Sequence, residues 1–484
     1  MGKRGRAFKK GKKGPKGKRK RRMATTGASL EVLLSRASRF QQEGRLLEAR
    51  QLFEEALERF PDFSSRHQVQ NALGTIYLRL KEFETARQIL EEASKDAEGR
   101  PYPPGLYNLA LASQQTGRFR EAAEIYERLL ALDPRNAMAW NNLALARKGT
   151  GDLEGAAEAA QRAVFLEPKW PEAWNNLAVI MELLDRLDRA EAGFKRAIEL
   201  RPGYLAALYN LGCLHHRMNR FEQASKCLRK VLDMAPEHKG ARFILQSLGE
   251  LEQPEHAPAA FVKETFDTFA EIFEHKLKKE LAYRTPEELY SLVRPHLWNE
   301  MRVLDLGCGT GLGAEYYRPF SAFLAGMDCS EKMLEKARQK GLYDELFCND
   351  ILRPWPRALS GLDLVYSSDC LVYFGNLARV FSRVHQALRP GGLFAFSVEN
   401  LDDTAPEAKN RTENGPGPRD SRGEEVGWQL HKSGRFAHSE AYIRSVLAKT
   451  DFELISLAST EIRREAGRPV KGMLVAARRA RQPG

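Results

Sequence analysis

Six alanines recur at a nearly constant interval through the first half of the chain. They are separated by 37, 36, 34, 34 and 34 residues, at Ala49, Ala86, Ala122, Ala156, Ala190 and Ala224. In most intervals a bulky or apolar residue lies four positions after the alanine, on the same helix face, and a proline soon ends the helix. The interval predicts stacked helix–turn–helix units, each burying its alanine against a neighbouring helix.

Leucines complete the repeated pattern. One lies thirteen residues before each of the last four alanines, at Leu109, Leu143, Leu177 and Leu211. The combination closely resembles the tetratricopeptide repeat (TPR) family. The resemblance implies an all-α solenoid over residues 27–251, with about six repeats and a closing helix at 238–249. Solenoids of this kind supply binding surfaces rather than catalysis.

An asparagine immediately precedes each of these leucines, at Asn108, Asn142, Asn176 and Asn210. Stacked repeats would place the four amides in a row. Because an amide both donates and accepts hydrogen bonds, such a row can hold an extended peptide backbone. The row is similar to the peptide-binding groove in the TPR part of O-GlcNAc transferases. The alternative is that asparagine is merely common here; we expect protein or peptide binding.

The positive charge of the chain is concentrated at its N-terminus. Residues 1–22 contain thirteen Lys and Arg and no acid, so removing them from the formal charge of +12 leaves −1. Residues 1–26 have almost no apolar side chains and are expected to be disordered. We expect the tail at residues 1–22 to contact nucleic acid or an acidic partner without sequence specificity. The alternative is a solvated tail that only raises solubility.

A glycine-rich loop follows the apolar stretch at residues 303–306, with Gly307, Gly309 and Gly311 at every second position. Glycine at the end of a buried parallel strand lets the backbone approach a ligand closely. A dinucleotide-binding fingerprint would need glycine where Leu312 stands, and no Gly-Lys-Ser/Thr follows to close a phosphate-binding loop. The remaining pattern, acid-x-Gly-x-Gly-x-Gly, resembles motif I of class I S-adenosylmethionine-dependent methyltransferases.

Residues 261–484 alternate strand and helix patterns, which is typical of an α/β doubly wound (Rossmann-like) sheet. The expected strands are 302–306, 323–327, 345–348, 362–366 and 393–398, with an antiparallel pair near 452–462 and 470–478. The polar segment 252–260 is interpreted as a linker between the solenoid and this domain.

A helical stripe precedes the first strand. It comprises Phe266, Phe269, Ala270, Phe273 and Leu277, and the pattern Leu-x-Tyr-Arg-x-Pro follows at 281–286. This order resembles a bacterial group of predicted TPR-containing methyltransferases, and the resemblance covers most of the chain except the tail. It implies a helix that caps the cofactor pocket. The alternative is an ordinary core helix.

The resemblance implies that S-adenosyl-L-methionine is the cofactor, held at the carboxyl ends of the strands. The positions that match the family are Asp305, Gly307, Gly309, Gly311, Asp328, Asp350, Ile351 and Ser367. The glycines would lie along the methionine moiety and Asp305 would face its positive charge. Asp328 would accept the ribose hydroxyls, and Asp350 the adenine amino group with Ile351 against the ring. The alternative is that each acid caps a helix.

Methyl transfer needs a general base only when the nucleophile arrives protonated. Candidates near the strand ends are Asp369, Tyr373, Glu399 and His438, of which we favour Asp369 and His438. A lone histidine is more often structural, but residues 433–439 match a segment of the same bacterial group. Six cysteines without a C-x-x-C pair, and no cluster of ligand residues, predict no metal site.

Three hypotheses about the function remain. The first is a methyltransferase whose solenoid selects a protein or peptide. The second is a methyltransferase of quinone-like or lipid-like small molecules whose solenoid serves assembly, and the third is an inactive scaffold. The glycine loop and the acids argue against the third, and the asparagines favour the first.

The sequence also indicates where the chain works. No apolar run is long enough to cross a bilayer, and no apolar segment follows the basic N-terminus as in a secretory signal. The cysteine pattern fits a reducing compartment. We expect a cytoplasmic protein, nuclear or nucleolar if the source is eukaryotic.

Overall fold

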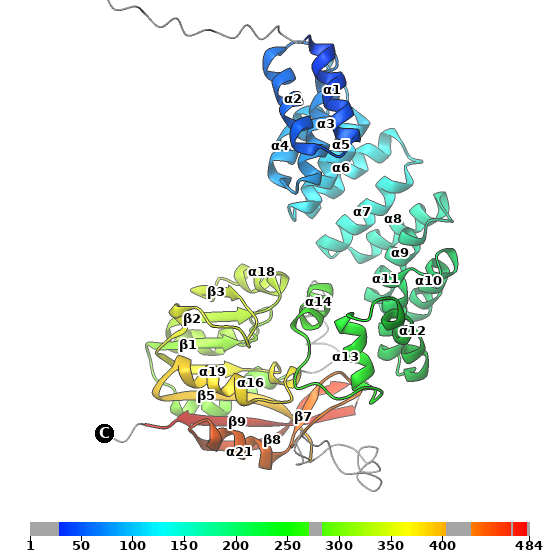
Figure 1. The fold of residues 1–484 in the computed structure, drawn as a ribbon. Helices are drawn as coiled ribbons and strands as arrows, with labels where there is room; N and C mark the ends of the chain where they lie inside the picture. Colours follow the sequence, from blue (N-terminus) through cyan, green and yellow to red (C-terminus); the bar gives the residue numbers. More distant parts are fainter. Residues whose placement is uncertain (1–28, 271–282, 403–426, 466–467, 482–484) are drawn as a thin grey trace, which may run out of the picture. The chain divides into compact units, whose positions relative to one another are not determined.

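The structure is a computed structural model that describes residues 29–270, 283–402, 427–465 and 468–481 (Figure 1). The expected tail at 1–26, and Phe273 and Leu277 of the helical stripe, lie outside the described residues. The chain divides into two compact units, Met1–Pro134 and Arg135–Gly484, and each is described by itself.

The first unit contains three helix pairs. Their helices are α1 (Leu30–Gln42), α2 (Leu46–Arg59), α3 (Arg66–Arg79), α4 (Phe83–Ala93), α5 (Pro103–Gln115) and α6 (Phe119–Leu132). The repeated alanines Ala49, Ala86 and Ala122 lie on the second helix of each pair and are fully buried. These small side chains let neighbouring helices pack closely, as the interval predicts.

The second unit begins with three further pairs and a closing helix. These are α7 (Ala137–Thr150), α8 (Leu153–Leu166), α9 (Pro171–Leu183), α10 (Leu187–Leu200), α11 (Leu205–Arg217), α12 (Phe221–Met234) and α13 (Lys239–Ser247). Ala156, Ala190 and Ala224 are again fully buried. Helix α13 closes the stack because its Ile244 and Leu245 share a core with Leu228 of α12. The predicted all-α repeat architecture is confirmed.

The rest of the second unit is built around a nine-stranded sheet. Its strands are β1 (Met301–Leu306), β2 (Ser321–Asp328), β3 (Glu345–Cys348), β4 (Leu362–Ser367), β5 (Leu388–Asn400), β6 (Trp428–Leu430), β7 (Phe436–His438), β8 (Phe452–Glu465) and β9 (Arg468–Arg479). The order β3-β2-β1-β4-β5 is parallel throughout. Strand β5 then pairs with β7 in parallel and with β9 in antiparallel orientation. This order confirms the predicted doubly wound sheet.

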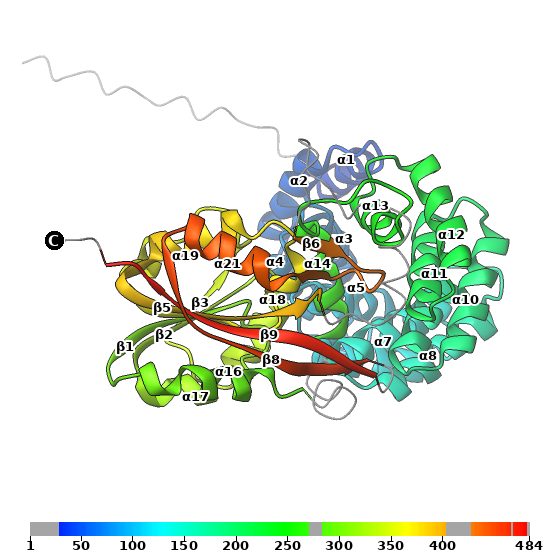
Figure 2. The ribbon, with the colours of Figure 1, turned by 90° about the horizontal axis from the view of Figure 1, so that it is seen from below.

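Helices cover both faces of the sheet (Figure 2). They are α16 (Thr285–Val293), α17 (Ala314–Tyr317), α18 (Glu331–Gln339), α19 (Ala378–Ala387) and α21 (Glu440–Lys449), with short 3-10 turns η1 (Arg294–His296), η2 (Arg318–Phe320), η3 (Arg357–Leu359) and η4 (Leu371–Tyr373). Helix α14 (Ala259–Phe269) contacts α13 and α18. Alternate residues of β1 point to opposite faces: Val303 packs with α16 and α17, and Leu304 with α19 and α21. The two faces therefore carry separate apolar cores.

Two features of the sheet differ from the sequence analysis. The hairpin β6–β7 was not expected, because three-residue strands carry too little alternation to be recognised. Strand β5 begins at Leu388, before the strand expected at 393–398, and includes Gly391 with a φ of 80°.

The segment interpreted as a linker is bound to the sheet domain. The Ala257 N–H donates to the Tyr373 carbonyl at 2.8 Å, and the N–H groups of Gly375 and Asn376 donate to the Glu255 carbonyl at 2.8 and 3.0 Å. The Leu430 N–H donates to the Gln253 side chain. We call residues 253–257 the strap. In the described parts of the chain, no helix has the length and apolar character to span a membrane.

The packing of the first unit generates a stability prediction. A Cβ at Gly105 of α5 would clash with the backbone carbonyl oxygen of Ala93 at the end of α4. Gly105→Ala should therefore destabilise the chain by about 1–3 kcal/mol through overpacking, less a gain of at most about 1 kcal/mol in helix propensity. Urea denaturation followed by circular dichroism measures this. Gly203→Ala is the control, because its Cβ would lie 3.5 Å from the nearest atom, Cε of Met234. Equal midpoints for the two variants would contradict the packing argument.

Candidate functional site

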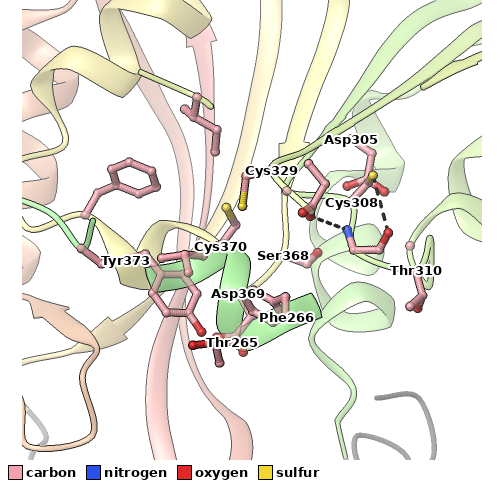
Figure 3. Close-up of a pocket in the computed structure, with 18 of the residues that line it drawn as sticks. Thr265, Phe266, Asp305, Cys308, Thr310, Cys329, Ser368, Asp369, Cys370 and Tyr373 are labelled. Atoms are coloured by element: carbon pink, nitrogen blue, oxygen red, sulfur yellow. Dashed lines mark hydrogen bonds between the residues drawn. The ribbon is translucent and has the colours of Figure 1, made fainter. Parts of the chain in front are cut away.

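A cavity of about 350 Å³ opens at the carboxyl ends of the parallel strands (Figure 3). The loops after β1, β2, β3 and β4 line it, together with α14, the strap and residues from β8 and the β6–β7 hairpin. This is where open α/β sheets bind ligands, and the volume is within the range of small-molecule sites. In the parts of the chain that the structure describes, no group of three His, Cys, Asp or Glu side chains could hold a metal ion.

The glycine loop has little room for side chains because neighbouring residues of the protein pack against it. Gly307, Gly309 and Gly311 have φ of 76°, 52° and 80°, a region that favours glycine. A Cβ at Gly307 would clash with Cys370, and one at Gly311 would lie 2.8 Å from the Tyr343 ring. Gly307 and Gly309 line the cavity but Gly311 does not. Tyr343 occupies the space that a side chain at position 311 would need, and a cofactor contact by the Gly311 backbone stays a prediction.

Asp328, at the end of β2, lines the cavity and also fixes the loop. Its Oδ2 accepts the Gly309 N–H and its Oδ1 accepts the Ser330 N–H, both at 2.9 Å. Burial raises the pKa of Asp328, and these N–H groups oppose the rise. Each carboxylate oxygen has a second lone pair, so both can still accept a ligand hydroxyl. Ser330, not Asp328, caps α18, through the Met333 N–H.

Asp305 is buried at the end of β1, on the cavity wall. The hydroxyls of Tyr343 and Tyr366 both donate to its Oδ2 at 2.7 Å. Burial raises the pKa of Asp305 to about 7, against the opposing effect of the two hydroxyls. A positively charged ligand beside it would favour the ionised form.

The third acid and its neighbour also line the cavity. Asp350 follows β3, and its Oδ1 accepts the Leu352 N–H at 2.9 Å. Ile351 is nearly fully buried beside it, with its side chain on the cavity wall. Three acids from three successive strand ends thus surround one space, as the sequence predicts for their positions.

Ser367 does not line the cavity. It is fully buried and its hydroxyl donates to the Leu306 carbonyl at 2.8 Å, because this last residue of β4 faces the sheet interior. Its expected contact with a cofactor is therefore wrong. The next residue, Ser368, lines the cavity instead. No partner among the described residues binds the buried Oγ of Ser368, nor that of Thr310 in the glycine loop.

These two hydroxyls and the acids test whether S-adenosylmethionine fits. A buried polar atom without a partner is costly, so Thr310 and Ser368 are suited to hydrogen-bond a polar ligand. The ribose diol of S-adenosylmethionine matches Asp328, its adenine amino group matches Asp350, and its positively charged centre matches Asp305. The residues present fit the cofactor.

Asp369 lies on the cavity wall in a strained conformation. Its φ is 57°, and its N–H donates to Ser397 Oγ at 2.8 Å. Arg463, a fully buried residue of β8, donates to Asp369 at 2.8 Å and also pairs with the buried Glu399. Sequence reasoning missed Arg463, since a lone arginine in a strand gives no signal of its partners. The Asp369 carboxylate is thus held in an ion pair with a buried guanidinium.

His438 lies outside the cavity. It is fully buried, its ring stacks on Tyr442, and its Nε2 lies 2.9 Å from the Phe374 carbonyl. Carbonyls only accept, so Nε2 carries the proton. Burial lowers the pKa of His438 to about 4. The expectation that His438 is catalytic is therefore wrong; it holds the turn after η4 in place. Tyr373 lines the cavity, and Glu399 reaches it only through Arg463.

The solenoid asparagines connect neighbouring repeats. In the second unit, the side-chain amide of Asn176 donates to Asn141 at 2.9 Å, and that of Asn210 donates to Asn175 at 3.1 Å. Within α7, Asn142 accepts a hydrogen bond from the adjacent Asn141 at 3.2 Å. In the first unit, Asn108 donates to Asn71 at 2.8 Å. The predicted row is thus also structural, and peptide binding by it stays a prediction.

Family models divide the chain as its structure does. A methyltransferase-domain model matches residues 271–457, and three tetratricopeptide-repeat models match residues 40–103, 107–171 and 171–237.

Individual proteins match either part. The malonyl-[acyl-carrier protein] O-methyltransferase of Pectobacterium atrosepticum is 33% identical over 119 residues, which are 25% of this chain and 46% of that protein. An S-adenosylmethionine dependent methyltransferase of known structure from Mesorhizobium loti is 27% identical, covering 39% of this chain and 96% of its own, with a TM-score of 0.30. YrrB, a TPR protein with an unusual peptide-binding site, is 21% identical, covering 40% and 97%, with a TM-score of 0.34. This chain spans less than half the length of the first curated relatives that it matches.

The buried alanine stack, the strand-end cavity and the matching family models agree with one another. The chain carries tetratricopeptide repeats over residues 40–237, followed by a methyltransferase domain whose cofactor is S-adenosylmethionine.

Proposed function

We propose that the chain transfers a methyl group from S-adenosylmethionine to a protein or peptide that the solenoid recruits. The observation that carries the proposal is the arrangement of Asp305, Asp328 and Asp350 around one cavity that also holds two unpartnered hydroxyls. The bound cofactor supplies an electrophilic methyl group on a sulfonium that leaves readily. The work of the chain is to position the reactants and exclude water.

The wall residues divide this work. Asp328 and Asp350 bind the polar edges of the nucleoside, and Ile351 packs against its base. Asp305 balances the positive charge. Helix α14 contributes Val262, Phe266 and Phe269 to the wall, and this apolar surface excludes water from the reacting atoms.

A small-molecule acceptor is the second candidate function. The curated relatives support it, because one is a malonyl-[acyl-carrier protein] O-methyltransferase and another, from Pneumocystis carinii, is a sterol 24-C-methyltransferase. In that case the solenoid would serve assembly or carrier recognition. An inactive scaffold would leave the acids and the unpartnered hydroxyls of the cavity without a role.

One experiment separates these candidates. The purified chain is incubated with S-adenosylmethionine tritiated in its methyl group and a cell lysate. Labelled polypeptide supports the proposal, labelled extractable material supports a small-molecule acceptor, and no label above that of the Asp328→Asn variant contradicts both.

The strand-end acid generates an affinity prediction. Asp328→Asn replaces an anionic acceptor by a neutral amide, so S-adenosylmethionine should bind about 1.5–3 kcal/mol more weakly. Isothermal titration calorimetry measures the loss. Glu335→Gln, on the exposed side of α18, is the matched control and should bind as the parent does. Equal affinity in both variants would remove Asp328 from the cofactor site.

The pKa of Asp305 generates a prediction about pH. Because that pKa is about 7 in the free protein, a cation bound beside the carboxylate lowers it, and binding must release a proton near pH 7. Affinity should fall below pH 7, by at most about tenfold per unit. Calorimetry in buffers of different ionisation enthalpy counts the released protons. Asp305→Asn should abolish the release, and a release that persists in this variant would assign it to another group.

The solenoid generates a prediction about acceptor binding. Replacing Asn176 and Asn210 by alanine should raise KM for a polypeptide acceptor, by about 1 kcal/mol for each amide, with little change in kcat. The matched control replaces Asn141 and Asn175. It breaks the same inter-repeat hydrogen bonds but keeps the two predicted groove amides. Steady-state kinetics with the labelled acceptor measures both. An equal rise in the control would show that the bonds between repeats matter, not the groove.

A further inference from the structure

The structure points to a general base that lies in the strap, outside the family's glycine and acid motifs. We infer that His256 removes a proton from the acceptor during methyl transfer, so the accepting atom is a hydroxyl oxygen or an amine nitrogen rather than a carboxylate. This inference rests on the proposed function and narrows its substrate class.

Backbone hydrogen bonds fix the position of His256. The residues on either side of it, Glu255 and Ala257, are bonded to the turn at Tyr373–Asn376, and His256 itself forms a β-bridge with Phe374. Its ring lies 6.5 Å from the Phe374 ring, and His256 is among the residues that line the cavity. This wall follows β4 and η4, on the side of the cavity that holds Asp369 and Tyr373 and away from the nucleoside-binding acids of β2 and β3.

A carbonyl oxygen sets the tautomer of the ring. His256 Nδ1 lies 3.1 Å from the Ala257 carbonyl, which only accepts, so the neutral ring carries its proton on Nδ1. The lone pair is then on Nε2. A histidine arranged in this way can accept a proton from a ligand in the cavity.

The other titratable groups of the cavity wall are less suited to this role. Asp369 is paired with Arg463, and Asp305 is held by two tyrosine hydroxyls. Burial raises the pKa of Tyr283 and Tyr373, so at neutral pH both hydroxyls are protonated and donate. His438, the histidine that sequence reasoning favoured, lies outside the cavity.

The proposed step is balanced. A lone pair of the acceptor oxygen or nitrogen forms the new bond to the methyl carbon, and the carbon–sulfur bond breaks with its electrons passing to sulfur. The acceptor proton passes to His256 Nε2, and the imidazolium then releases it to solvent. A carboxylate acceptor carries no proton at neutral pH and would need no base.

Several charged or titratable groups share this cavity and contribute to its pH profile. They are Asp305, Asp328, Asp350, Asp369, Arg435, Arg463, Tyr283 and Tyr373, with Glu255 beside His256 on the strap. A pH profile alone therefore cannot assign the base, so the experiment also uses chemical rescue and the stability of the product.

The test compares His256→Ala with the control His296→Ala in the full chain. His296 lies in η1, outside the cavity. With tritiated S-adenosylmethionine and the lysate fraction that the parent labels, His256→Ala should lower kcat by about 10²-fold or more, and added imidazole should restore part of it. The affinity for S-adenosylhomocysteine, measured by calorimetry, should be unchanged. The transferred label should resist mild alkali, as methyl ethers and methylamines do and methyl esters do not.

Three results would overturn the inference: an unchanged kcat in His256→Ala, a lost kcat that imidazole does not restore although S-adenosylhomocysteine still binds, or a label released by alkali as methanol. If His256→Ala fails to bind S-adenosylhomocysteine, His256→Gln, which keeps a polar side chain, takes its place in the same comparison. Failure of the parent chain to label anything would contradict the proposed function instead.

Discussion

The site depends on one carboxylate. Asp328 holds the Gly309 N–H of the loop after β1 and the Ser330 N–H before α18. The Ser330 hydroxyl in turn donates to Asp267 of α14 at 2.6 Å. The loop after β1, the start of α18 and helix α14 are thus joined by three hydrogen bonds. A carboxylate accepts each of these bonds, and such bonds are stronger than those between neutral groups when the carboxylate is ionised. The same carboxylate that shapes the loop also lines the cavity, so a single residue serves loop geometry and the proposed cofactor contact.

Sequence patterns correctly predicted the elements whose residues recur at a regular interval or at equivalent strand ends. The alanine interval placed all six repeats, and each of the six alanines is fully buried, where a small side chain lets the helices approach closely. The glycine loop and the acids at 305, 328 and 350 were placed correctly at the cavity because parallel strands bring their carboxyl ends to one edge. In both cases a geometric constraint on the backbone recurs, so it produces a recognisable sequence pattern.

The direction in which an individual side chain points produces no such pattern, and the sequence analysis was wrong about such directions. Ser367 and Ser368 are neighbours, and only the residue at which β4 ends decides which of them faces the cavity. His438 lies in a three-residue strand whose pairing with β5 directs it into the interior. A side chain at position 311 would clash with the ring of Tyr343, a residue more than thirty positions away. Each outcome depends on a tertiary contact that no local pattern encodes.

The strap shows why a polar, proline-containing segment is not necessarily a spacer. Its N–H and C=O groups need partners wherever water is displaced, and the turn after η4 supplies them. Immediately beyond it, Phe261 of α14 contacts Phe243 of α13 at 5.0 Å between ring centroids, while Val262 and Phe266 line the cavity. One continuous segment therefore packs against the closing helix of the repeats and forms a wall of the methyltransferase cavity. Phe261 and Val262, adjacent residues of α14, thus contact the closing helix of the repeats and the cavity, respectively.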